Sequence, residues 1–247
     1  MSTLAGVRIG TFNIQHGRDH LRYLETKTET IDLALMASVI RENALDVCAL
    51  NEVRDEENTP VACNQAKELA ALLGYHYHFA KAIDFRGGGY GNAIVSRYPI
   101  RSVRTYAIAI PKSERLDGGH YYEDRVLLSA ELDVNGTPLT VLACHFGLAP
   151  DEQSLAVETA KRALAETHHP VILLGDFNVR PDSEIYRALA ETFTDTSDGS
   201  KPDFTFPSHA PNRKIDYIFT ASGARAGAFT ICPRPASDHL AVYVDLA

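Results

Sequence analysis

The sequence predicts a single domain of the α+β class, with packed β-sheets that carry helices on their outer faces. The chain has 247 residues, which suits one large domain, and no low-complexity linker divides it. Some predicted strands follow one another directly, as around Asn135-Gly136, the strongest short hairpin signal. Other strands stand singly between helical segments. We therefore expect residues 1–247 to form one domain.

The N-terminal half alternates short apolar runs with segments of helical periodicity. Residues 7–13 predict the first strand, and apolar residues recur at helical spacing from Ile31 to Asn43. Thr26 and Glu29 resemble a capping box, which would start this helix. Further strands are predicted at 46–50, 75–79 and 92–97, with a helix at 64–73 and an interruption at 87–91.

The C-terminal half contains the stretch that organises the prediction, Val171 to Leu174 followed by Gly175. Four large apolar residues indicate a short strand buried on both faces, and glycine then permits an unusual backbone conformation. The remaining predicted strands are 126–134, 137–144, 215–220, 227–231 and 240–246, and the remaining helices are 154–167 and 182–191. Two long polar loops, 112–124 and 195–214, are typical of lids or binding segments.

Composition and charge limit the classes of protein. Hydrophobic residues make up 45% and charged residues 23%, as in an ordinary globular protein. The net charge is −8, and no Lys/Arg run occurs. Proteins that bind long nucleic acid usually carry a basic surface, so a nucleic-acid partner is possible but not favoured.

We expect a cytoplasmic location and no transmembrane segment. No run approaches the roughly 18 apolar residues of a membrane-spanning helix. The N-terminus lacks the basic and apolar regions of a signal peptide. The four cysteines are scattered without a Cys-x-x-Cys pair, which argues against a disulfide framework or a thiolate metal site.

Several predicted strands end or begin in polar residues that a strand end does not require. Asp176 and Asn178 are two positions apart, so an extended backbone would point both the same way. Taken singly, each such residue can be explained by a local turn or cap. One shared site explains all of them together, and its oxygen-rich inventory suits a divalent cation. The set is Asn13, Glu52, His145, Asp176, Asn178, Asp216, Asp238 and His239.

Seven motifs carry a family resemblance. They are Thr11-Phe12-Asn13-Ile14, Leu50-Asn51-Glu52-Val53, Gly91-Asn92-Ala93-Ile94-Val95-Ser96-Arg97-Tyr98-Pro99, Cys144-His145-Phe146, Gly175-Asp176-Phe177-Asn178, Ile215-Asp216-Tyr217-Ile218 and Ser237-Asp238-His239. In this order they resemble the endonuclease/exonuclease/phosphatase superfamily of metal-dependent phosphoesterases, from residue 7 to residue 244. The resemblance implies a four-layer α/β/β/α sandwich of two mostly antiparallel sheets, with the site at one end.

The resemblance also implies a metal site. Glu52 would be the principal ligand of Mg²⁺, with Mn²⁺ as the alternative. Asn13 would support the metal directly or through water, and Asp238 would help to bind it.

The catalytic residues implied are Asp176, Asn178, His239, His145 and Asp216. Asp176 would orient or deprotonate the attacking water, and Asn178 would hold a phosphoryl oxygen. His239, held by Asp216, would act as donor or general base, and His145 would donate to a non-bridging oxygen. The sequence leaves open whether Asp176 or the His239–Asp216 pair is the base.

The expected activity is hydrolysis of a phosphoester, by a phosphodiesterase that acts on a small-molecule or lipid-derived substrate. The alternative within the family is a nuclease that cleaves DNA or RNA. The alternative from another class is a non-catalytic binding domain on the same fold. Tyr90, Asn92 and Arg125 are candidate substrate contacts, although Arg125 could equally form a surface ion pair beside Glu123.

Overall fold

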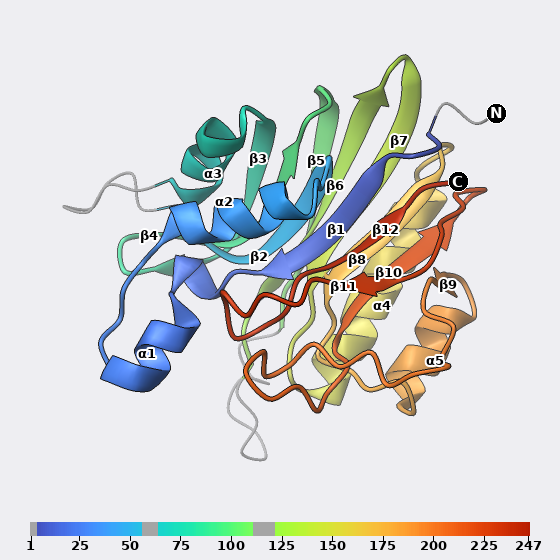
Figure 1. The fold of residues 1–247 in the computed structure, drawn as a ribbon. Coiled ribbons are helices and arrows are strands. Elements are labelled where there is room, and N and C mark those ends of the chain that lie inside the picture. The colour runs from blue at the N-terminus through green and yellow to red at the C-terminus, as the bar shows by residue number, and fades with distance from the viewer. Residues whose placement is uncertain (1–3, 56–63, 111–121) are drawn as a thin grey trace.

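A computed structural model describes residues 4–55, 64–110 and 122–247, and shows two six-stranded sheets packed face to face (Figure 1). The first sheet has the spatial order β11 (Thr230–Ile231), β12 (Val242–Asp245), β1 (Arg8–Asn13), β2 (Val47–Asp55), β4 (Gly88–Ser96) and β3 (His76–Phe85). The second has the order β5 (Ile100–Ile108), β6 (Arg125–Val134), β7 (Thr137–His145), β8 (Val171–Asp176), β10 (Asp216–Ala221) and β9 (Thr194–Asp195). Most neighbouring strands are antiparallel; β1–β2 and β7–β8 are parallel.

Helices cover the outer faces of the two sheets. The described helices are α1 (His20–Thr26), α2 (Leu33–Glu42), α3 (Gln65–Leu73), α4 (Pro150–Ala165) and α5 (Glu184–Ala190), with a short 3₁₀ turn at Gln15–Gly17, and α2 to α5 form these outer layers. Helices α2 and α3 pack on the first sheet, and α4 and α5 pack on the second. The predicted four-layer α/β/β/α sandwich is confirmed. None of the helices in the described ranges is long and apolar enough to cross a membrane.

Three apolar clusters correspond to the three interfaces between layers. Residues of β8 show why both faces of the strands must be apolar: Ile172 and Leu174 point into the cluster between the sheets, whereas Val171 and Leu173 point into the cluster beneath α4 and α5. All four are fully buried. This period-2 division explains the continuous apolar run that organised the sequence prediction.

Local structure departs from the prediction in several places, which include the unpredicted helix α1 and strand β9. The helix expected after Thr26 begins at Leu33, because the Asp32 carboxylate accepts a hydrogen bond from the Leu35 amide and caps it; Thr26 instead ends α1. Of the interruption expected at 87–91, residues 88–91 belong to strand β4. Strand β5 was not predicted; it lies at the edge of its sheet, and its residues 101–105 are all exposed. Residues 112–121 of the predicted loop 112–124 lie outside the described residues.

The parallel pairs at the centre of each sheet bring strand ends together. Asn13 at the end of β1 is in register with Asn51 of β2, and His145 at the end of β7 is in register with Asp176 of β8. Asp216 at the start of the antiparallel β10 is opposite Asp176. The same edge of the sandwich therefore collects polar residues from five strands.

Asn51 joins the two sheets with a fully buried side chain. Its amide nitrogen donates to Asn92 Oδ1 at 2.9 Å and to Cys144 O at 2.8 Å, and its oxygen accepts from the Asp176 amide at 3.0 Å. Asn92 is in the first sheet, whereas Cys144 and Asp176 are in the second. One carboxamide therefore sets how the ends of β7 and β8 lie against β2 and β4.

Close approach of the second sheet's strands also requires glycine at position 175. Its φ is +150°, and a Cβ atom there would lie 1.9 Å from the carbonyl oxygen of Cys144. No other residue type fits this backbone without moving β7 away from β8.

We predict that Asn51→Ala lowers the free energy of unfolding by about 2–4 kcal/mol, because it leaves the Asp176 amide and two buried oxygens without a partner. Urea unfolding measures this change. The matched control is Asn212→Ala at an exposed position, which we expect to change the free energy by less than about 0.5 kcal/mol. Equal stability of the two variants would show that Asn51 is not a clamp between the sheets.

Candidate active site

A cleft of about 540 Å³ opens at the edge of the sandwich where these strand ends meet. Its walls contain Glu52, His145, Asp176, Asn178, Asp238 and His239. These residues come from both halves of the chain, between residue 52 and residue 239, yet they share one cavity. The convergence expected from the sequence is therefore present for this set.

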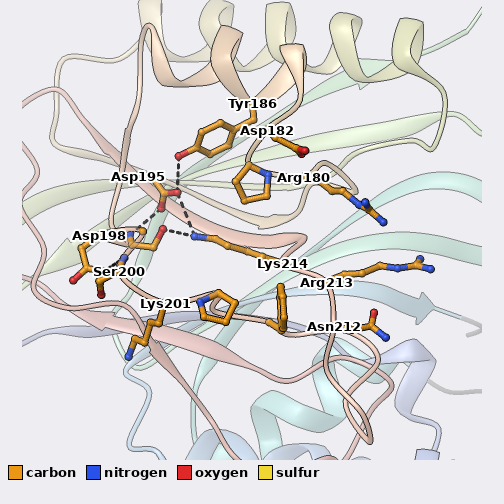
Figure 2. Close-up of a pocket in the computed structure, with 15 residues that line it drawn as sticks. Arg180, Asp182, Tyr186, Asp195, Asp198, Ser200, Lys201, Asn212, Arg213 and Lys214 are labelled. Atoms are coloured by element: carbon orange, nitrogen blue, oxygen red, sulfur yellow. Dashed lines mark hydrogen bonds and ion pairs between the residues drawn. The ribbon is translucent and has the colours of Figure 1, made fainter.

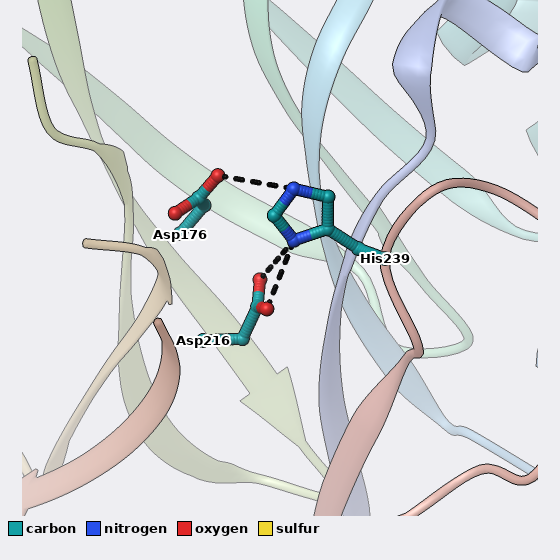
Figure 3. Close-up of side chains that lie close together, drawn as sticks. All are labelled: Asp176, Asp216 and His239. Atoms are coloured by element: carbon teal, nitrogen blue, oxygen red, sulfur yellow. Dashed lines mark hydrogen bonds and ion pairs between the residues drawn. The ribbon is translucent and has the colours of Figure 1, made fainter. Parts of the chain in front are cut away.

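His239 lies between two carboxylates, as Figure 3 shows. Its Nδ1 is 2.9 Å from Asp216 Oδ2, and its Nε2 is 3.6 Å from Asp176 Oδ2. The hydroxyl of Thr205 donates to the same Asp216 oxygen at 2.5 Å, and the Phe206 ring packs on the imidazole with centroids 4.8 Å apart. The imidazole is thereby fixed in one orientation, with Nε2 directed to Asp176.

Burial would by itself lower the pKa of His239, but the facing carboxylates of Asp216 and Asp176 outweigh it and raise that pKa to about 10. Burial, reinforced by Asp216 and opposed by His239, raises the pKa of Asp176 to about 7. At neutral pH the imidazole therefore carries both protons, and Asp176 is close to its point of half-ionisation.

Asn178 and His145 lie on the other side of Asp176. The Asn178 amide nitrogen is 3.3 Å from His145 Nε2, and its backbone N–H donates to Asp176 Oδ1 at 3.0 Å. Burial, with Arg125 and His239 nearby, lowers the pKa of His145 well below its ordinary value. His145 is therefore a neutral imidazole that can present one N–H to a ligand, unlike the charged His239.

A second group of carboxylates lies on the side of the cleft formed by the first sheet. Glu52 sits in a β-bulge of β2 with φ +58°, and accepts hydrogen bonds from Asn13 Nδ2 at 3.0 Å and from the Tyr90 hydroxyl at 2.7 Å. Asp238 accepts from Gln15 Nε2 at 2.8 Å. Neither Glu52 nor Asp238 forms an ion pair with a cationic side chain of the described residues.

Asn13 connects the two groups of acids. Its amide nitrogen donates to Glu52 Oε1 and, at 3.2 Å, to Asp176 Oδ2, while its oxygen accepts from the Gln15 backbone amide at 3.0 Å. The side chain therefore turns its NH₂ group, not its oxygen, towards the carboxylates. This orientation suits the positioning of both acids better than direct donation of an oxygen to a cation.

The donor set fits a divalent cation on the Glu52 side of the cleft. Burial, opposed by His239 and reinforced by Glu52, raises the pKa of Asp238, and a cation bound nearby would favour its carboxylate form. Atoms of Asp176, Asp216 and His239 also lie within 4.8 Å of one another in the described chain, a spacing that a metal can bridge. Both ring nitrogens of His239 already face carboxylates, however, whereas Glu52 and Asp238 form no ion pair within the described chain, so Glu52 and Asp238 fit the cation better.

Of the three candidate substrate contacts, two line the cleft and one does not. Tyr90 and Arg125 line the cleft, and Arg125 also forms the ion pair with Glu123 at 2.6 Å that the sequence left open. Asn92 does not line it: its amide is buried behind the cleft and donates to the Val126 carbonyl at 2.8 Å. The geometry gives Asn92 a structural position.

Sequence reasoning missed several residues of this site. Asn51 was quoted only as part of a motif, and Arg180, Phe206 and Arg213 also line or border the cleft. Arg180 follows Asn178 by two positions, so its proximity could have been inferred. Phe206 and Arg213 belong to the long loop 195–214, whose path no periodicity in the sequence reveals.

Comparison with known proteins agrees with this geometry. The model of the Endonuclease/Exonuclease/phosphatase family matches residues 10–239. The uncharacterized protein YbhP of Escherichia coli K12 is 23% identical over 229 residues, which cover 86% of this chain and 85% of that protein.

Solved structures share the fold at low sequence identity. A family protein from Leptotrichia buccalis has a TM-score of 0.75 at 20% identity, covering 98% of this chain and 99% of its own. The mannosyl-6-phosphatase Bt3783 of Bacteroides thetaiotaomicron has a TM-score of 0.75 at 17% identity, with the same coverage. Since the family model covers most of the sequence, the chain belongs to the endonuclease/exonuclease/phosphatase family.

Proposed function

We propose that the chain hydrolyses a phosphate ester with the help of a divalent cation, Mg²⁺ or alternatively Mn²⁺. Members of the family are usually hydrolases of phosphoesters and typically use divalent metals. The observation that carries the proposal is the pairing, in one cleft, of a proton-rich side at His239 with an acid-rich side at Glu52 and Asp238. A phosphoryl group needs both, because negative charge develops on its oxygens as water attacks.

In the proposed site, Glu52 and Asp238 hold the cation, and Asn13 orients Glu52 and Asp176 through its amide. The bound cation would supply Lewis acidity and neutralise charge on the phosphoryl oxygens. Its positive charge would also oppose the effect of burial, which, reinforced by Glu52, raises the pKa of Asp238.

Asp176 is proposed as the base that receives the proton of the attacking water. A pKa of about 7 places it where a general base works best at neutral pH, whereas His239 already carries a proton. His239, held by Asp216, then acts as a donor to the phosphate, and Asn178 and His145 donate to its other oxygens. This assignment chooses between the two bases that the sequence left open.

We propose a small-molecule or lipid-derived phosphoester as the substrate, in preference to long nucleic acid. The chain carries a net charge of −8, and the acids of the cleft add to that charge where a polyanion would have to bind. The mannosyl-6-phosphatase among the similar structures acts on a small phosphoester by its name, which is in line with this choice. Phosphodiester specificity stays a prediction from the sequence.

We predict that Asp176→Asn lowers kcat/KM for bis-p-nitrophenyl phosphate on the order of 10²–10⁴-fold, because it removes the base. The matched control is Asp84→Asn, whose carboxylate is 84% exposed on β3 and should leave the rate unchanged. Circular dichroism verifies that both variants are folded. Full activity of Asp176→Asn would refute the assignment of the base.

The same assay should compare p-nitrophenyl phosphate and a labelled oligonucleotide, each with Mg²⁺ or Mn²⁺. The proposal expects the small esters to be cleaved faster. Preferred cleavage of the oligonucleotide would identify a nuclease. Absence of hydrolysis for every ester and both metals would favour the non-catalytic binding domain.

We predict that the metal-free protein loses stability as the pH rises. The folded pKa of His239, about 10, exceeds its ordinary 6.5, so its contribution is complete below pH 6.5 and disappears towards pH 10. The folded pKa of Asp176, about 7, exceeds its ordinary 3.8, so the folded state also loses stability between those values.

Since a cation must displace protons from these acids, the rise in Tm on adding Mg²⁺ should grow between about pH 5.5 and pH 8.5. Thermal unfolding with Mg²⁺ or with a chelator measures it. Glu52→Gln should abolish most of the rise at every pH, whereas the Asp84→Asn control should retain it. A rise that is independent of pH, or that survives Glu52→Gln, would place the cation elsewhere.

A further inference from the structure

A larger pocket, of about 750 Å³, lies directly beside the active-site cleft (Figure 2). The polar loop 195–214 and the approach to α5 form its walls. Arg180 and Arg213 line both this pocket and the cleft, so the two cavities meet at these two side chains. Figure 2 shows both guanidinium groups extending in the same direction, away from the back wall of the pocket.

The back wall is held by buried polar contacts. Lys214 Nζ lies 3.4 Å from Asp195 Oδ2 and also contacts the Ser197 hydroxyl, and the side chains of Lys214 and Asp195 are only 6% and 9% exposed. The Tyr186 hydroxyl donates to the same Asp195 oxygen at 3.0 Å. These contacts tie the loop to α5, so the pocket is a preformed cavity and not a surface irregularity.

Arg180 and Arg213 differ from the side chains of this wall, whose polar groups contact one another. Both are exposed, and neither forms an ion pair with a carboxylate within the described ranges. The Arg213 guanidinium lies 5.8 Å from the centre of the Phe206 ring, which itself packs on His239. Two guanidinium groups that pair with no carboxylate of the described chain therefore lie at the boundary where a substrate would pass from the cleft into the pocket, which Asp182 and Asp198 also line.

We propose that the pocket receives the non-reacting part of the phosphoester, and that Arg180 and Arg213 bind a second anionic group carried by that part. The inference rests on the proposed function, because it requires a phosphate in the neighbouring cleft. Guanidinium groups bind phosphate and carboxylate through paired N–H donors, so both arginines suit this task. The preferred substrates are then small molecules with two separated anionic groups.

A different role for these arginines would be to hold the reacting phosphate itself, since they also line the cleft. The two roles differ in what they predict. Arginines that bind a second anion matter only for ligands that carry one, whereas arginines on the reacting phosphate matter for every ligand.

The test measures binding by calorimetry in an Asp176→Asn background with Mg²⁺, so that no ligand is consumed. The probes are α,ω-alkanediol bisphosphates of increasing length, each compared with the monophosphate of the same diol. We expect at least one bisphosphate to bind about tenfold more tightly than its monophosphate, as a charge-assisted hydrogen bond provides. Arg180→Gln with Arg213→Gln should abolish this preference, because it should weaken binding of the bisphosphate about tenfold more than binding of the monophosphate.

Arg225→Gln, at an exposed position in another part of the chain, is the matched control and should keep the preference. Failure of every bisphosphate to bind more tightly than its monophosphate overturns the inference. An equal loss of binding for both ligands in the double variant also overturns it, and assigns the arginines to the reacting phosphate. Because binding is measured without turnover, a lack of hydrolysis by the natural sequence would refute the proposed function separately.

Discussion

The buried carboxamide of Asn51 is the contact on which the geometry of the site depends. Its three hydrogen bonds reach β4, β7 and β8, and one of them fixes the backbone of Asp176 itself. Glu52 follows directly in a β-bulge, which turns its carboxylate towards the cleft while Asn51 points between the sheets. The two adjacent residues thus hold the acid-rich side of the cleft and the end of β8 at Asp176 in fixed positions relative to each other. A shift of either sheet would move Asp176 away from Glu52.

One small cleft contains both a protonated imidazole and carboxylates that form no ion pair within the described chain. His239 is kept protonated by Asp216 and Asp176, whereas Glu52 and Asp238 have no cationic partner among the described side chains. Asp176 stands between them and is bonded to the Asn13 amide. A fold that buries acids without neutralising them loses stability unless a ligand supplies the positive charge. The protein's own charges, and not only its family, therefore favour a bound cation.

Much of the fold and part of the site could be predicted from the sequence, for physical reasons that differ between residues. Asp176 and Asn178 could be predicted as site residues because an apolar run and a glycine, which end a strand, directly precede them. The start of α2 was misplaced because Thr26 and Asp32 are both good caps, and only tertiary packing decides between them. Asn92 was taken for a substrate contact because sequence does not reveal which way a strand residue faces. Its amide points between the sheets.

The central claim is that a divalent cation binds on the Glu52 side of the cleft while His239 stays protonated. The most direct test is the anomalous scattering of Mn²⁺ in crystals grown near neutral pH. The account predicts one peak within about 2.3 Å of a Glu52 carboxylate oxygen, with the contact between His239 and Asp216 intact. A peak bonded to His239 and Asp216, or no peak in the cleft, would contradict it.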